Sequence, residues 1–286
     1  MADRITVQTL AKKIEKLEGK NDWYGCLCDV FELSAIVLSN QFDYREPYWS
    51  NREKRYKDLI KKYDEDEFKQ LQEIFSDLYI LLSQMAEPDG VFDDYLGRLY
   101  MFSGTSSKRA GQFFTPYNVS KLCAEMTIRG KDIANQQIIT LNEPTCGSGG
   151  MVLAGVEALR NKGVNYADRL LVVCSDVDKR CVYMTYLQLA LSGVPAIILH
   201  QNTLTLETFD EWHTPALCLN WMRFRKTIRY ISHQLTEEEM KEYDEWNKTY
   251  NAGETHQEQT TEMVNVVREF ENAYFQIKNK ETPVLN

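Results

Sequence analysis

The run from Asn142 to Met151 contains the residues best suited to bind a ligand through the backbone. It reads Asn-Glu-Pro-Thr-Cys-Gly-Ser-Gly-Gly-Met and follows the apolar stretch 138–141, which is a candidate strand. Glycines between a strand and a helix let backbone amides approach a ligand, and the helix N-terminus adds a partial positive charge. A cofactor carboxylate or phosphate fits such a turn. Glycine also serves tight turns for conformational reasons alone, so the neighbouring segments must decide.

Acidic side chains follow the next candidate strand, at residues 170–174. The strand runs into Ser175-Asp176-Val177-Asp178. In a doubly wound parallel sheet, an acidic residue at this place binds ribose hydroxyls. One of the two aspartates can instead cap the helix expected from Lys179, and both roles can coexist. A glycine loop followed by an acidic strand end indicates a nucleoside-binding site.

Short apolar runs alternate with helical segments in the middle of the chain, and these elements would position the two motifs. The candidate strands are 138–141, 170–174, 196–200 and 217–219, and the helices between them are 151–162 and 179–192. This alternation predicts a mainly parallel sheet with right-handed crossovers. The expected fold class is therefore α/β and Rossmann-like.

Both ends of the chain are expected to be helical. Apolar residues repeat at three and four positions over 67–85, and 26–38 and 51–62 are further helix candidates. Thr236 and Glu239 form a capping box, and Met263, Val267 and Phe270 begin an apolar stripe that favours internal packing over docking on a subunit. The expected division is a helical domain at 1–104, a Rossmann-like domain at 105–232 and a helical extension at 233–286.

Two further motifs give the sequence a family resemblance. Ala110 to Pro116 reads Ala-Gly-Gln-Phe-Phe-Thr-Pro, and Asp94 to Tyr100 precedes it as a candidate helix. With the glycine loop and Asp176 following in order, the chain resembles the gamma-class amino-methyltransferases in the modification subunits of type I restriction enzymes. The resemblance implies a class I S-adenosylmethionine-dependent methyltransferase fold and methyl transfer to adenine N6 in DNA.

The resemblance also assigns cofactor roles to individual residues. The 113–116 segment would lie against the methionine end of S-adenosylmethionine, the glycine loop would hold its amino-acid portion, Asp176 the ribose, and Asn202 the adenine ring. One of the two phenylalanines is expected to face the core instead. The implied cofactor-binding residues are Gln112, Phe113, Phe114, Thr115, Pro116, Glu143, Pro144, Cys146, Gly147, Ser148, Gly149, Asp176, Val177 and Asn202.

The catalytic tetrad of this family, Asn or Asp followed by two prolines and an aromatic residue, does not occur in the sequence. In the family it accepts hydrogen bonds from the target amino group and stacks on the flipped base. Two replacements are candidates: Pro215 in the loop 213–216, and Asn220 with Trp221 after the expected strand 217–219. Trp221 can equally be a packing residue. The sheet is expected to be truncated.

Composition limits the partners and the location. The chain has 286 residues, a formal charge of -9 and seven cysteines in no C-x-x-C pair. Reduced core thiols, no metal site, no membrane span and a cytoplasmic location are expected. A chain this acidic needs a local basic patch or a partner subunit to hold DNA.

The sequence leaves several functions open. The first is an adenine-N6 DNA methyltransferase. The second is an inactive homologue that binds cofactor, DNA or a restriction-modification, phage or plasmid partner protein as a regulator or scaffold. A methyltransferase for RNA, protein or a small molecule is a more remote hypothesis, because fold does not fix function. A dehydrogenase is disfavoured because the loop lacks the G-x-G-x-x-G spacing.

Overall fold

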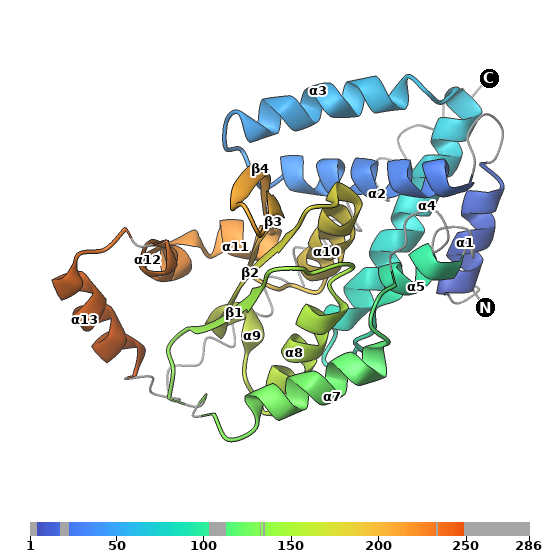
Figure 1. Cartoon of the computed structure of the whole chain (residues 1–286). Helices are drawn as coiled ribbons and strands as arrows, with labels where there is room; N and C mark the ends of the chain where they lie inside the picture. The colour runs from blue at the N-terminus through green and yellow to red at the C-terminus, as the bar shows by residue number, and fades with distance from the viewer. Residues whose placement is uncertain are drawn as a thin grey trace, which may run out of the picture.

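The computed structural model describes residues 5–17, 23–102, 113–131, 133, 135–232 and 234–248 (Figure 1). A helical region comes first and is followed by a four-stranded sheet with helices on both faces. The expected α/β class with a mainly parallel sheet is confirmed. In the described part of the chain, no helix is both long enough and apolar enough to cross a membrane.

The helical region confirms the helices expected over 26–38, 51–62 and 67–85. The capping box of Asp64 and Glu67 begins the third of them, and a short 3-10 turn ends it before Pro88. Its elements are α1 (Val7–Glu15), α2 (Trp23–Asn40), α3 (Tyr48–Ile60), α4 (Glu65–Ser83), η1 (Gln84–Ala86) and α5 (Tyr95–Phe102).

The sheet has the order β1-β2-β3-β4, in which the first three strands are parallel and β4 is antiparallel to β3. Strands β1 (Ile139–Glu143), β2 (Leu170–Asp176) and β3 (Ala196–Asn202) confirm three of the expected strands. Between them lie α8 (Gly150–Asn161), the short α9 (Tyr166–Arg169) and α10 (Lys179–Leu191), while α7 (Tyr117–Ile128) precedes β1. The carboxyl ends of β1, β2 and β3 therefore meet at one edge of the sheet.

The fourth expected strand, 217–219, is wrong. These residues belong to the helix α11 (Pro215–Leu219), whose first position is Pro215. A short apolar run fits a buried helix turn as well as a strand, and here the proline decides. The actual fourth strand, β4 (Glu207–His213), has the sequence Glu-Thr-Phe-Asp-Glu-Trp-His. It was missed because it lacks a continuous apolar run and its outer half is exposed.

Each face of the sheet has its own buried cluster. Val172, Cys174 and Ile198 pack in the larger core, which also contains residues of α1, α2, α4 and α5 as well as of α8 and α10. Leu171 and Ile197 face the smaller core with Leu217 of α11. The larger core thus includes side chains from both sides of the domain boundary expected at residue 104.

The last described elements cover part of the second face. They are α12 (Trp221–Ile231) and α13 (Glu237–Asn247), which lie across the sheet from α4 and α5 (Figure 1). The expected capping box of Thr236 and Glu239 begins α13. Asn247 accepts hydrogen bonds from the amides of Gln137 and Ile138, the two residues that precede β1. The apolar stripe that begins at Met263 lies outside the described residues.

Candidate functional site

The glycine loop connects β1 to α8 at the carboxyl edge of the sheet. Gly147 and Gly149 have φ values of +56° and +95°, in the left-handed region that favours glycine. A Cβ on Gly147 would lie 3.2 Å from Cδ1 of Phe114, and one on Gly149 would lie 3.1 Å from Oγ1 of Thr185. The backbone conformation therefore favours glycine at both positions, and the neighbouring side chains leave little room for a Cβ.

The N-terminus of α8 is uncapped among the described residues. Gly149 occupies the N-cap position and has no side chain to accept a hydrogen bond from the first turn. The amides of a first helical turn have no partner inside the helix, and the helix dipole makes this end attractive to anions. The loop therefore offers backbone donors to a carboxylate or phosphate.

Asp176 ends β2 and faces the glycine loop. Its Oδ2 accepts a hydrogen bond from the Gly147 amide at 2.9 Å, and its Oδ1 accepts one from the Asp178 amide at 2.9 Å. Burial raises the pKa of Asp176 despite these bonds. Asp178 caps α10 by accepting from the Arg180 amide at 3.0 Å. Asp178 therefore has the capping role expected for one of the pair, and Asp176 is turned to the loop.

The Phe113–Pro116 segment approaches the loop from the start of α7. Phe114 is half-buried, lies edge to face with Tyr100 at 5.4 Å between ring centroids, and is close to Gly147. Phe113 is 75% exposed, so Phe114 is the member of the pair that faces the core. Gln112, also expected at the cofactor, lies outside the described residues.

Glu157 of α8 anchors the first turns of α7. Its carboxylate accepts from the Tyr117 hydroxyl at 2.9 Å and from the Lys121 ammonium group at 2.8 Å. These bonds fix the start of α7 to α8, and Pro116 at the N-cap of α7 and the exposed Thr115 directly precede it.

The turn after β3 completes this edge. Thr203, which the sequence did not single out, donates to the Pro144 carbonyl at 2.6 Å and so ties the turn to the glycine loop. Oδ1 of Asn202 accepts from the Leu204 amide at 3.0 Å, whereas Val177 is 63% exposed. Glu143 accepts from the Thr145 amide at 3.2 Å, and Cys146 and Ser148 of the loop are buried. The one sequence signal that could have indicated Thr203 is its hydroxyl-bearing side chain shortly after the predicted strand 196–200.

The three candidates for base binding lie elsewhere. Strand register pairs Asp176 with His200 but His213 with Ile197, three residues back along β3. At about 3.3 Å per residue, His213 is roughly 10 Å from the level of Asp176, toward the amino edge of the parallel strands. Pro215, Asn220 and Trp221 follow His213 in α11 and at the start of α12. The structure does not bring them to the glycine loop.

Side chains at the amino edge are engaged with one another. Asn220 donates from Nδ2 to the Ala216 carbonyl at 3.1 Å, and the Trp221 ring stacks on the His213 ring at 5.8 Å. Pro215 is buried. Asn220 also fails to end a strand, since α11 replaces the one that was expected.

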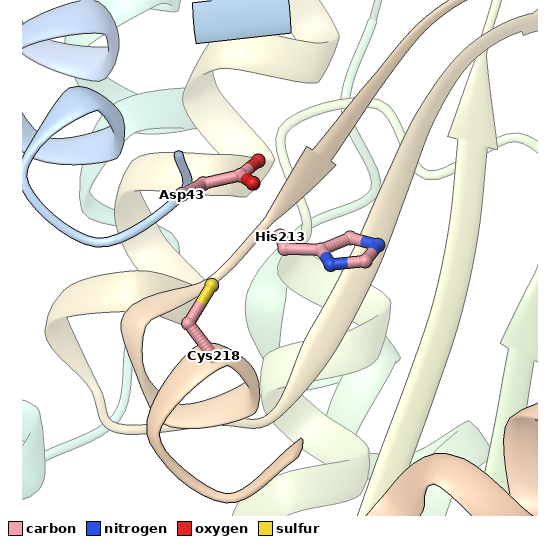
Figure 2. A group of neighbouring side chains, drawn as sticks. All are labelled: Asp43, His213 and Cys218. Atoms are coloured by element: carbon pink, nitrogen blue, oxygen red, sulfur yellow. The ribbon is translucent and has the colours of Figure 1, made fainter. Parts of the chain in front are cut away.

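Asp43, His213 and Cys218 form a compact group at this edge (Figure 2). Their ligand-type atoms lie within 4.8 Å of one another. Burial would raise the pKa of Asp43, but Arg45 and Arg52 outweigh it and lower the pKa to about 2. His213 is 2.7 Å from Glu211, and burial raises the pKa of the Cys218 thiol to about 12. Two guanidinium groups thus already neutralise the carboxylate that a cation would need.

The comparisons with known proteins agree with the motifs. The sequence profile of the N-6 DNA Methylase family matches residues 87–266, so the chain belongs to this family. The methylase subunit of the type I restriction enzyme MjaIX from Methanocaldococcus jannaschii is 27% identical over 127 residues. That match covers 41% of this chain and 21% of the relative, so the chain spans about a fifth of the length of that protein.

Two solved structures match the chain with low TM-scores. A protein described as a class I S-adenosylmethionine-dependent methyltransferase from Listeria monocytogenes has a TM-score of 0.37 and 14% identity, covering 69% of this chain and 54% of that one. The methyltransferase subunit of a type I restriction-modification system from Streptococcus thermophilus has a TM-score of 0.33 and 15% identity, covering 66% and 57%.

Proposed function

We propose that this member of the N-6 DNA methylase family binds S-adenosylmethionine at the carboxyl edge of its sheet. One observation carries the proposal: Phe114 and Asp176, which are far apart in sequence, both contact the glycine loop at Gly147. Phe114 closes one side of this glycine, and the Asp176 carboxylate accepts from its amide. This convergence supports a nucleoside cofactor rather than a turn that needs glycine only for its shape.

The donors and acceptors at this edge fit the cofactor. The uncapped first turn of α8 would receive the carboxylate of the methionine portion. Each oxygen of Asp176 accepts one backbone N–H and keeps capacity for a ribose hydroxyl. Because Oδ1 of Asn202 is used by Leu204, its Nδ2 group would donate to a ring nitrogen of adenine. The cofactor would supply an electrophilic methyl group, and these residues would bind and orient it.

The reaction proposed is methyl transfer to adenine N6 in DNA, following the family. The relatives named as methylase or methyltransferase subunits of type I systems support a partner subunit that holds or reads the DNA. A partner also suits a chain with a formal charge of -9, since phosphate contacts require clustered positive charge.

A second candidate is a homologue that binds the cofactor without transferring methyl groups and acts as a regulator or scaffold. Its support is the missing tetrad together with the register, which places Pro215, Asn220 and Trp221 toward the opposite edge from Asp176. None of these residues is positioned to replace the tetrad beside the proposed cofactor.

Calorimetric titration with S-adenosylmethionine tests the proposal. Wild type is expected to bind, and Asp176→Ala is expected to bind at least about tenfold more weakly, because a carboxylate hydrogen bond contributes about 1.5–3 kcal/mol. Asp58→Ala, which removes an exposed carboxylate of α3, is the control and should bind as wild type does. Failure of wild type to bind would refute the cofactor site.

Transfer of tritiated methyl groups to DNA separates the two candidates. Incorporation that requires Asp176 but survives Asn220→Ala would support an enzyme that does not use Asn220 to hold the base. Cofactor binding without incorporation, with and without a type I partner subunit, would support the inactive homologue. Incorporation abolished by Asn220→Ala in a folded protein would contradict the assignment of Asn220 to packing.

A further inference from the structure

Asp94 places a buried carboxylate directly beneath the glycine loop. It precedes α5 and is 4% exposed. The carboxylate accepts from the Gly97 amide at 2.9 Å, from Nε2 of Gln188 at 2.9 Å and from Oγ of Ser148 at 2.5 Å. A residue of the N-terminal helical region is therefore hydrogen bonded to the loop itself.

Gln188 of α10 completes the connection. Its Nε2 also donates to the Ser148 carbonyl at 2.6 Å, and its Oε1 accepts from the Leu96 amide at 3.2 Å. Both the side chain and the backbone of Ser148 are thus fixed, one by Asp94 and the other by Gln188. The loop residue two positions before α8 is held from α5 and α10 together.

Two glycines make room for the carboxylate. A Cβ on Gly97 would lie 2.1 Å from Oδ2 of Asp94 and 2.6 Å from Oγ of Ser148. A Cβ on Gly150, the first residue of α8, would lie 3.0 Å from Oδ2 of Asp94. The close approach of α5 to the loop therefore depends on the absence of side chains on both elements.

The carboxylate has no ion-pair partner among the described residues. Arg98, on the same helix, pairs with Asp93 instead. The neighbouring ionisable groups are the Asp93 carboxylate and the Tyr117 phenol of α7, while α10 and the loop contribute the uncharged Gln188 and Ser148. Burial raises the pKa of Asp94. Burying a carboxyl group without a cation is costly, and hydrogen bonds to the loop offset that cost.

We infer that Asp94 is a positioning residue for the cofactor: through Ser148 it sets the glycine loop and the first amides of α8 in the geometry that receives the amino-acid portion of S-adenosylmethionine. The inference rests on the proposed function for the identity of the ligand. It adds that the helical region controls cofactor affinity through one buried carboxyl group.

Titration calorimetry with S-adenosylmethionine tests this role in the full chain. Asp94→Ala is expected to weaken binding at least about tenfold, since it leaves Ser148 and Gln188 without their shared acceptor. Asp94→Asn should restore affinity to within about threefold, because its oxygen can accept from Gly97 and Gln188 while its amide donates to Ser148. The control is Asp93→Asn, which changes the adjacent carboxylate and should bind as wild type does.

A pH series and a double mutant distinguish positioning from general destabilisation. As pH falls and Asp94 becomes protonated, the affinities of wild type and Asp94→Asn should converge, since both then present one acceptor and one donor. Ser148→Ala should weaken S-adenosylmethionine binding. Adding Asp94→Ala to Ser148→Ala should then weaken binding much less than Asp94→Ala does in the wild-type protein. Additive losses, or wild-type affinity in Asp94→Ala, would overturn the inference.

Amide hydrogen exchange without cofactor keeps the test independent of the proposed function. Asp94→Ala should accelerate exchange in residues 147–151 at least about tenfold while global unfolding stays slower, and Asp93→Asn should not. If wild type binds no S-adenosylmethionine, the proposed function fails while this experiment still tests the positioning role. Unchanged exchange in a folded Asp94→Ala protein would refute that role.

Discussion

The two edges of the sheet use their polar groups in different ways. At the carboxyl edge, left-handed glycines and a helix without a cap among the described residues leave backbone donors available, and Asp176 accepts from two backbone amides. At the amino edge, Asp43 is paired with two arginines, and His213 lies between Glu211 and Trp221. The first arrangement suits a ligand and the second suits packing. Residues that the family resemblance suggested for base binding therefore belong to the packed edge.

The largest effect on stability is expected from Asp43→Ala. Arg52 is 4% exposed, and removing its partner leaves a buried guanidinium group without its nearest carboxylate. Loss of one member of a buried pair costs about 3–5 kcal/mol of unfolding free energy, measurable by urea denaturation. Asp58→Ala, which removes an exposed pair with Lys61, is the control and should leave the unfolding free energy close to that of wild type. Equal effects of the two variants would contradict a packed amino edge.

The pH dependence of stability should report the same group. Because the pKa of Asp43 is lowered from 3.8 to about 2 in the folded state, its contribution is present above pH 4 and is lost as pH falls toward 2. The shift corresponds to about 2 kcal/mol. Urea denaturation across this range should show that the unfolding free energy of wild type decreases as pH falls. The decrease in Asp43→Asn should be smaller by about this amount. An equal decrease in both proteins would place the acid sensitivity elsewhere.

Two alanine substitutions at left-handed glycines should separate ligand binding from backbone strain. Gly149 lies in the loop, whereas Gly163 has a φ of +77° and no heavy atom within 4 Å of the position of a Cβ. Each substitution should cost about 1–2 kcal/mol of stability. Only Gly149→Ala should also weaken S-adenosylmethionine binding, by about tenfold, in a calorimetric titration. Similar affinities in the two variants would argue against the loop as the binding site.

The smallest effect is expected at the amino edge. Trp221→Ala removes a ring that is 40% exposed and stacked on His213. Its S-adenosylmethionine affinity should remain within about twofold of wild type, because direct contacts are needed for larger losses. A larger loss in calorimetry would show that the two edges are coupled.

The sequence predicted the elements whose local residue pattern matches the way they pack in the fold. The buried strands β1, β2 and β3 are apolar runs with turn signals, and the helices of the N-terminal region have regular apolar spacing. Residues 217–219 were misassigned because a run of three apolar residues fits either a strand or a helix, and β4 was missed because its pairing with β3 stabilises a mostly polar sequence. Local pattern alone cannot decide such cases.

The candidate site also combines residues that a local pattern indicates with residues that only the fold brings together. Glycines in a turn and an aspartate after a strand can be recognised from neighbours in sequence, and both lie at the carboxyl edge. The role of Asp94 depends on Ser148 and Gln188, which only the folded chain brings to it. The separation of Asn220 from the loop likewise depends on strand register, which the sequence left undetermined.

Amide hydrogen exchange of wild type with and without saturating S-adenosylmethionine tests the contrast between the edges most directly. The cofactor should slow exchange in residues 143–151 and 174–178, where backbone amides surround the proposed site, and leave residues 213–221 unchanged. Protection confined to 213–221, or no protection at the glycine loop despite measurable binding, would contradict the assignment of the cofactor to the carboxyl edge.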